Sequence, residues 1–154
     1  MYLPNTNVLS DLNPDRPGPN QHLVDWLRRH GDLCYLSTVT LTEIAYGVAW
    51  PRSRGATART ARLGTWLEEI IRYHEARILP VDTDIALQAG VLLANARAAG
   101  VEPDTTDGWI GATAKVHGLE VLTFNMADFR PVVTRSPTHR RTERNRYAQT
   151  ATYV

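Results

Sequence analysis

The sequence predicts an α/β domain in which a central parallel β-sheet lies between layers of helices. Short apolar segments suited to strands alternate with longer segments of helical periodicity, and this alternation is typical of a parallel sheet covered on both faces. A chain of 154 residues, 43% of them hydrophobic, is long enough to close one core. We therefore expect one globular domain over residues 1–133, followed by a polar extension over residues 134–154.

The N-terminal third of the chain is predicted to form two strands and three helices. An apolar strand over residues 1–4 passes through polar capping residues into a short helix over residues 5–12. Apolar residues recur at helical spacing over residues 21–30, directly before a glycine, and residues 33–40 have the aromatic and β-branched composition of a buried strand. A helix over residues 41–50 is then expected to end at a proline.

The remaining segments continue the alternation. A long helix is predicted from about residue 56 to residue 74, and a strand over residues 77–82 follows it. Two helices over residues 84–100 and 108–118 each end at a glycine, and the last predicted strand covers residues 119–125. The sequence contains no internal repeat.

Charge is distributed unevenly along the chain. The net charge is +1, which argues against a protein that binds nucleic acid through bulk charge alone. The extension carries one glutamate, Glu143, and five arginines: Arg135, Arg140, Arg141, Arg144 and Arg146. The extension therefore has a net charge of +4, and the rest of the chain has a net charge of −3. This basic and polar composition, without apolar periodicity, predicts a mobile tail.

The single cysteine and the absence of a long apolar run predict a cytoplasmic, soluble protein. Cys34 has no second cysteine to pair with, so neither an intrachain disulfide nor a thiol-based zinc site can form. The N-terminus lacks a basic start followed by an apolar run, and no stretch approaches the roughly 20 apolar residues of a membrane span.

Polar side chains are predicted to gather where the strands of this sheet end. Functional groups in parallel sheets collect at the carboxyl ends of the strands, beside the point where the strand order reverses. Four separate segments bring polar oxygens to that edge, and the residues are Asn5, Glu43, Asp107 and the neighbours Asn125 and Asp128. Taken alone, each acidic residue at a helix start is more simply a cap or a stabiliser of the helix dipole. The four segments together predict a functional site at the carboxyl edge of the sheet.

Oxygen ligands without a cluster of His or Cys suit a hard cation, and Mg²⁺ is usually held by a few carboxylates and water. The sequence contains no glycine-rich phosphate loop, no nucleophile elbow and no H-E-x-x-H pair. A phosphorylated receiver domain is also disfavoured, because its acceptor position would be Asn5 and the lone lysine, Lys115, lies inside a predicted helix.

Three stretches resemble the motifs of PIN-domain proteins and, in order and spacing, those of VapC-type toxins. They are YLPNTNVLSDL, YLSTVTLTEIAYGV and DGWIGATAKVHGLEVLTFNMADF, and the match covers roughly residues 1–130. The resemblance implies a three-layer α/β/α fold with a parallel sheet. It further implies cleavage of RNA that depends on Mg²⁺, with Mn²⁺ as a substitute, by a homodimer that a small antitoxin silences.

Carried over residue by residue, the resemblance implies four metal-binding and catalytic positions, namely Asn5, Glu43, Asp107 and Asp128. It implies two hydroxyl neighbours, Thr6 and Thr123. The fourth acidic position stays open between Asn125 and Asp128, with Asp128 favoured. Asp104 is expected to lie outside the site, as a loop or capping residue, and the residues Trp109, Ile110, Ala112 and Ala114 are expected to pack into the core.

Asn5 departs from the pattern, because the family has Asp at this position. Asn keeps the shape and one oxygen but removes a negative charge, which should weaken a site that holds a dication. Two explanations stay open. Asn5 is either the natural residue of a silent module that binds RNA or antitoxin without cleaving, or an inactivating change in a harmful toxin, which we favour.

A basic stretch over residues 45–67 lacks acidic residues and contains Arg52, Arg54, Arg59 and Arg62. These arginines either form a solvated helix face or hold RNA phosphates beside an acidic site that would repel them. The resemblance places the antitoxin groove near this region, so it also implies partner contacts for the apolar residues Trp50, Leu63, Trp66 and Leu67.

Overall fold

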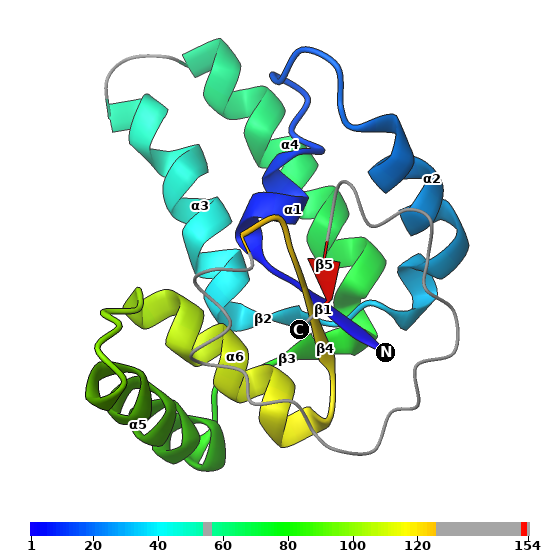
Figure 1. Cartoon of the computed structure of the whole chain (residues 1–154). Helices are drawn as coiled ribbons and strands as arrows, with labels where there is room; N and C mark the ends of the chain where they lie inside the picture. Colours follow the sequence, from blue (N-terminus) through cyan, green and yellow to red (C-terminus); the bar gives the residue numbers. More distant parts are fainter. Residues whose placement is uncertain (54–56, 126–151, 154) are drawn as a thin grey trace.

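The structure is a computed structural model that describes residues 1–53, 57–125 and 152–153 (Figure 1). The N-terminal part contains β1 (Tyr2–Pro4), α1 (Thr6–Ser10), α2 (Gln21–His30), η1 (Gly31–Leu33), β2 (Leu36–Ser37) and α3 (Thr38–Ser53). The rest contains α4 (Thr57–His74), η2 (Glu75–Arg77), β3 (Ile78–Leu79), α5 (Thr83–Ala98), α6 (Thr105–His117), β4 (Glu120–Thr123) and β5 (Thr152–Tyr153). The elements η1 and η2 are short 3₁₀ turns.

The central strands are parallel, as the sequence predicts. Strand β1 pairs with β4 in the register Leu3↔Val121, and β2 pairs with β3. A single bridge between Tyr2 and Cys34, with a hydrogen bond of 2.8 Å from the Tyr35 amide to the Tyr2 carbonyl, joins the two pairs. The parallel strands therefore follow the order β3, β2, β1, β4. From β1 the chain continues to β2 and β3 on one side, whereas β4 lies on the other side of β1, so the strand order reverses between β1 and β4. This is the place where α/β sheets bind ligands.

Helices cover the two faces of the sheet, so the fold has three layers (Figure 1). Side chains alternate across β4: Val121 packs with Ile110 of α6, whereas Leu122 packs with Val8 of α1 and Leu23 of α2. A further hydrophobic cluster contains Leu9 of α1, Ile44 of α3 and Ile70 of α4. Helix α5 packs against α6 on the side away from the sheet. The α/β prediction is confirmed.

Helix α6 lies between the sheet and α5, and its small residues make this arrangement feasible. Ile110, Ala112 and Ala114 are buried, as expected, and Trp109 is half-buried against the α5 cluster. A Cβ atom on Gly108 would lie 2.5 Å from Cδ2 of Leu93. The glycine therefore sets how closely α5 approaches α6.

Two predicted boundaries around α3 are wrong. Residues 38–40 belong to α3 rather than to the preceding strand, although they are β-branched, because the Ser37 hydroxyl accepts the Val39 amide at 3.2 Å and starts the helix. The helix also continues two residues past Pro51. A proline in the last turn removes one backbone donor, and the residues after it still reach carbonyls on its N-terminal side.

The C-terminal extension is described at its very end, where β5 pairs antiparallel with β4 through Leu122↔Tyr153. Residues 134–151 lie outside the described residues, so the predicted mobile tail and the domain boundary stay predictions. None of the helices in the described part of the chain has both the length and the apolar composition that a membrane span needs.

Candidate functional site

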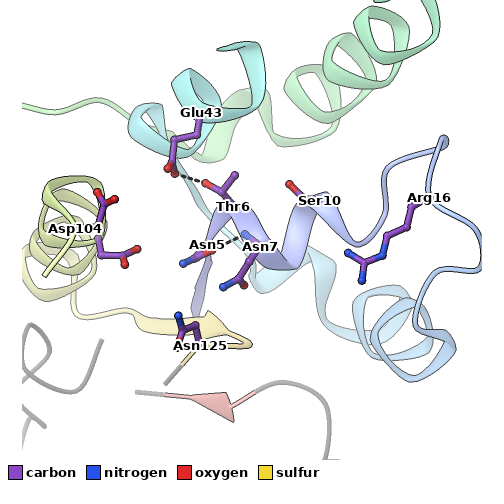
Figure 2. A pocket seen from close by; sticks show the side chains of 9 residues that line it. Asn5, Thr6, Asn7, Ser10, Arg16, Glu43, Asp104 and Asn125 are labelled. Atoms are coloured by element: carbon purple, nitrogen blue, oxygen red, sulfur yellow. Dashed lines mark hydrogen bonds between the residues drawn. The ribbon is translucent and has the colours of Figure 1, made fainter. Parts of the chain in front are cut away.

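A cavity of about 470 Å³ opens at the carboxyl ends of β1 and β4 (Figure 2). This volume lies within the range of about 300–1,000 Å³ that small-ligand sites occupy. The lining side chains are all polar or charged: Asn5, Thr6, Asn7, Ser10, Arg16, Glu43, Asp104, Asp107 and Asn125. The structure thus brings four predicted positions, Asn5, Glu43, Asp107 and Asn125, to one cavity at the edge of the sheet where the sequence predicts a site.

Asn5 occupies the N-cap of α1, directly after β1. Its backbone N–H donates to the Leu122 carbonyl at 2.9 Å, which joins it to β4, and its side chain is nearly buried. The Oδ1 atom accepts the N–H of Asn7 at 2.6 Å, and this bond satisfies one of the free donors of the helix start. Since Oδ1 serves the cap, the second terminal atom of the Asn5 side chain is an NH₂ group, which can only donate.

Glu43 reaches the cavity from α3, where Thr6 orients it. The Thr6 hydroxyl donates to Oε2 of Glu43, which leaves the second carboxylate oxygen open to other partners (Figure 2). Glu43 does not sit in the first turn of its helix, because α3 begins at Thr38 and has no acidic residue in that turn. Stabilisation of the helix dipole therefore does not account for this carboxylate.

Asp104 and Asp107 both belong to the start of α6 but have different surroundings. Asp104 is the N-cap: its Oδ1 accepts the Thr106 amide at 2.8 Å and the Thr106 hydroxyl, and these bonds lower the pKa of the Asp104 carboxyl. The capping role expected for Asp104 is confirmed, yet its side chain also lines the cavity. Asp107 lies in the first turn, half-buried, so it is not the helix cap.

Asn7 ties α1 to the end of β4. Its Nδ2 donates to the Thr123 hydroxyl at 3.2 Å, and its Oδ1 accepts the Phe124 amide at 3.2 Å. Thr123 is fully buried, and its hydroxyl also accepts the Asn125 amide at 3.0 Å. The Thr123 hydroxyl therefore holds two residues that line the cavity, Asn7 and Asn125. Asp128 lies outside the described residues, so the choice between Asn125 and Asp128 stays open.

The arginines predicted to bind RNA have other partners or fall outside the description. Arg59 and Arg62 of α4 both pair with the half-buried Asp15 carboxylate, at 3.1 Å and 2.8 Å. Arg54 lies outside the described residues, as does the side chain of Arg52. The two described arginines therefore fasten the loop between α1 and α2 to α4.

The apolar residues expected at a partner surface divide into two groups. Leu63 is buried, and Trp66 and Leu67 pack against the same cluster as Ile44, so these three belong to the core. Trp50 stays at the surface, where its ring stacks on that of Tyr46 with centroids 5.9 Å apart. Trp50 is 49% exposed and Tyr46 is 65% exposed.

Three residues of the cavity wall were not predicted from the sequence, namely Asn7, Ser10 and Arg16, and Asp104 was wrongly expected to lie outside the site. Ser10 lies four residues after Thr6, so helical spacing could have placed it on the same face of α1. Arg16 lies in a loop whose course local spacing does not predict. Its neighbours Pro14, Pro17 and Pro19 do indicate a stiff segment.

The donor chemistry of the cavity fits a hard cation. Glu43, Asp104 and Asp107 offer carboxylate oxygens, which Mg²⁺ prefers, and water commonly completes such a site. Within the described ranges, no three His, Cys, Asp or Glu side chains lie together as a metal cluster. Asn5 supplies a neutral amide at the same edge of the sheet.

The fold and the cavity together define an α/β domain with an oxygen-lined, acidic site at the carboxyl edge of its sheet. The sequence profile of the PIN domain matches residues 2–132, and the chain belongs to the PIN-domain family. The resemblance inferred from the motifs is thereby confirmed.

The chain is similar to several named proteins over most of its length. Toxin FitB of Neisseria gonorrhoeae is 35% identical over 131 residues, which are 84% of this chain and 91% of FitB. The VapC ribonuclease Y4jK of Sinorhizobium fredii is 30% identical over 131 residues, 84% of this chain and 90% of that protein.

Solved structures of related complexes share the fold. The crystal structure of FitAcB from Neisseria gonorrhoeae superposes with a TM-score of 0.72 at 35% identity and covers 86% of this chain and 93% of the matched one. DNA-bound VapBC from Salmonella typhimurium gives a TM-score of 0.70 at 23% identity, over 84% of this chain and 89% of that chain. At that identity the second likeness supports the fold alone.

Proposed function

We propose that the chain is a VapC-type toxin, a Mg²⁺-dependent endoribonuclease that a small antitoxin silences, and that Asn5 weakens its activity. The cavity between β1 and β4 carries the proposal, because it joins Glu43 and Asp107 from distant elements at the switch point of the sheet. The names of the relatives support it: one is a VapC ribonuclease and another is a toxin.

Glu43 and Asp107 would hold the metal, with Asp128 or Asn125 from the segment after β4. When bound, a dication supplies charge stabilisation to a phosphodiester transition state and lowers the pKa of water. The Thr6 hydroxyl holds one Glu43 oxygen, so the other is presented to the cavity in a fixed direction. Asp104 keeps its charge to low pH through its bonds to Thr106 and adds to the negative potential that attracts a cation.

Asn5 lowers the affinity of this site for metal through two effects. It removes one negative charge, and it offers the cavity a single oxygen that already accepts the Asn7 backbone N–H, because an NH₂ group takes the place of the second oxygen of an aspartate. An aspartate would cap α1 with one oxygen and keep the other for the cavity. The same observation favours the second candidate function, a silent PIN module that binds RNA or antitoxin without cleavage.

Partner contacts are proposed on surfaces away from the core. The stacked and exposed Tyr46 and Trp50 on α3 offer an apolar patch for the antitoxin, since aromatic anchors of this kind dominate protein interfaces. On α5, the exposed Leu87 and Val91 lie four residues apart on one face and suit the homodimer contact. Arg59 and Arg62 remain more than half exposed beside Asp15, so their RNA-binding role stays a proposal.

Cleavage of a labelled RNA by the present chain and by Asn5→Asp tests the proposal. The Asn5→Asp protein is expected to cleave in Mg²⁺ and to lose cleavage in EDTA, and the present chain is expected to be about 10²- to 10³-fold slower. Asn5→Asp combined with Glu43→Gln serves as the control, because it restores the first carboxylate and removes the second. Absence of Mg²⁺-dependent cleavage by Asn5→Asp would favour the silent module.

A further inference from the structure

Arg16 places a positive charge in a cavity whose other charged residues are acidic. Among the residues that line it, Arg16 is the one cation, and three others are carboxylates: Glu43, Asp104 and Asp107. Figure 2 shows Asp104 and Arg16 on opposite sides of the cavity, with Thr6 and Ser10 of α1 between them. One end therefore suits a cation and the other end suits an anion.

A buried carboxylate holds Arg16 in this position. Asp11 is 5% exposed and pairs with the Arg16 guanidinium at 3.2 Å. Its second oxygen accepts the Asn20 amide at 2.9 Å, so Asp11 connects both halves of the loop that contains Arg16. Asp11 also caps the C-terminal end of α1, where a negative charge is unfavourable to the helix dipole. Helix stability therefore does not explain this aspartate, whereas its contacts with the Arg16 guanidinium and the Asn20 backbone N–H do.

Several restraints act on the loop around Arg16, which also contains Gly18 in a left-handed conformation. Pro14, Pro17 and Pro19 restrict its backbone, and the helical region is disfavoured for a residue that precedes a proline, as Arg16 does. The neighbouring Asp15 is fastened to α4 by its ion pairs with Arg59 and Arg62. The Arg16 backbone is therefore held by restraints on both sides. A charged group held in advance loses less conformational entropy when it binds a ligand.

The Arg16 side chain remains available to a ligand. Its side chain is 55% exposed although it contacts Asp11. One carboxylate does not use all five N–H donors of a guanidinium, and these donors match the geometry of phosphate oxygens. Ser10 and Asn7 on the adjoining wall add short polar side chains of the kind that contact phosphate and sugar.

We propose that Arg16 is an RNA-binding residue that holds a backbone phosphate next to the scissile one, at the end of the cavity opposite Asp104. The proposal rests on the proposed ribonuclease function and adds a specific substrate contact to it. The three carboxylates repel an RNA strand, and a fixed cation at the far end offsets this repulsion and sets the direction in which the strand enters. Arg59 and Arg62 also brace the loop that carries Arg16, through their ion pairs with Asp15.

The salt dependence of RNA binding tests this role. Affinity for a fluorescent single-stranded RNA is measured by anisotropy over a KCl series at one fixed Mg²⁺ concentration, with the weakly active present chain as the parent protein. Arg16→Gln is expected to weaken binding about tenfold at low salt. It is also expected to reduce the slope of log affinity against log salt by about 0.7, the value for one phosphate contact on a single strand.

Matched variants separate the contact from a change in net charge or folding. Arg28→Gln removes a more exposed charge on α2, with a side-chain exposure of 73% against 55% for Arg16, that is also paired with an aspartate, and it should leave both quantities unchanged. Arg16→Lys keeps the charge and should retain most of the slope. Asp11→Asn with Arg16→Gln avoids an unpaired buried carboxylate and should match Arg16→Gln in RNA binding, although its melting temperature differs.

Equal affinities and slopes for Arg16→Gln and Arg28→Gln would overturn the proposal and leave Arg16 as a partner of Asp11 in holding the loop. That result would not affect the ribonuclease function, which Asn5→Asp cleavage tests separately. If the present chain binds no RNA and Asn5→Asp does not cleave, both proposals fail.

Discussion

The Oδ1 atom of Asn5 accepts the backbone N–H of Asn7 at 2.6 Å, so the other terminal atom of the side chain is the amide nitrogen. Asparagine and aspartate cap helices about equally well, so α1 tolerates either residue. The two residues differ in the remaining atom, which is a donor in asparagine and an anionic acceptor in aspartate. The position can therefore change the chemistry of the site while it preserves the fold.

Asp107 and Asp104 are expected to respond differently to replacement by alanine. Asp107→Ala should lower the Mg²⁺ or Mn²⁺ affinity and barely change the melting temperature, because Asp107 is not the helix cap. Asp104→Ala should lower stability by about 1 kcal/mol through loss of the N-cap bond to Thr106. Calorimetry of metal binding and thermal melts measure both. A large loss of melting temperature in Asp107→Ala with unchanged metal affinity would show that Asp107 is structural.

Gly108→Ala should destabilise the fold by about 1–3 kcal/mol, because its Cβ would lie 2.5 Å from Cδ2 of Leu93 between α5 and α6. Gly64→Ala on α4 is the matched control, since nothing lies within 4 Å of the Cβ position there. That change should stabilise the helix by up to about 1 kcal/mol. Urea unfolding of the two variants compares them directly. A neutral Gly108→Ala would indicate that α5 and α6 are not held this closely.

His74 is expected to make stability fall at acidic pH. Burial is the main cause that lowers its pKa below 6.5, and the nearby Arg77 acts in the same direction, whereas the hydrogen bond with the Ile70 carbonyl acts against it. The folded state therefore binds a proton less readily than the unfolded state. Stability from this group is complete above pH 6.5, declines as the pH falls through that value, and levels off below the lowered pKa.

Unfolding free energies of the parent and of His74→Asn, measured over a pH series, check this expectation. The difference between the two proteins should narrow as the pH falls from 7 to 5, because asparagine takes up no proton. His22→Gln on the exposed start of α2 is the control. A constant difference between parent and His74→Asn across the series would contradict the expected linkage.

The sequence predicted those features that depend on local pattern and on the alternation of elements. Asn5, Glu43 and Asp107 could be placed at one edge because each follows a predicted strand or begins a predicted helix. The start of α3 was missed because Thr38, Val39 and Thr40 favour strands locally, and the bond from the Val39 amide to the Ser37 hydroxyl overrides that tendency.

Contacts between distant residues were not predictable from spacing. Asp15 lies 47 residues before Arg62, and nothing local shows that α4 approaches the first loop. The sequence therefore predicted an RNA-binding surface for the arginines of α4 without their ion pairs to Asp15. Arg16 was missed for the same reason, because its place at the cavity depends on the course of the loop.

The stability change that Mg²⁺ produces in Asn5→Asp, compared with the present chain, tests the account most directly. In EDTA the added carboxylate should destabilise the protein, because like charges at short range repel one another. Mg²⁺ should raise the melting temperature of Asn5→Asp more than that of the present chain, since it binds the folded form more tightly. Equal Mg²⁺-induced shifts in the two proteins would contradict the claim that Asn5 withholds a charged ligand from the site.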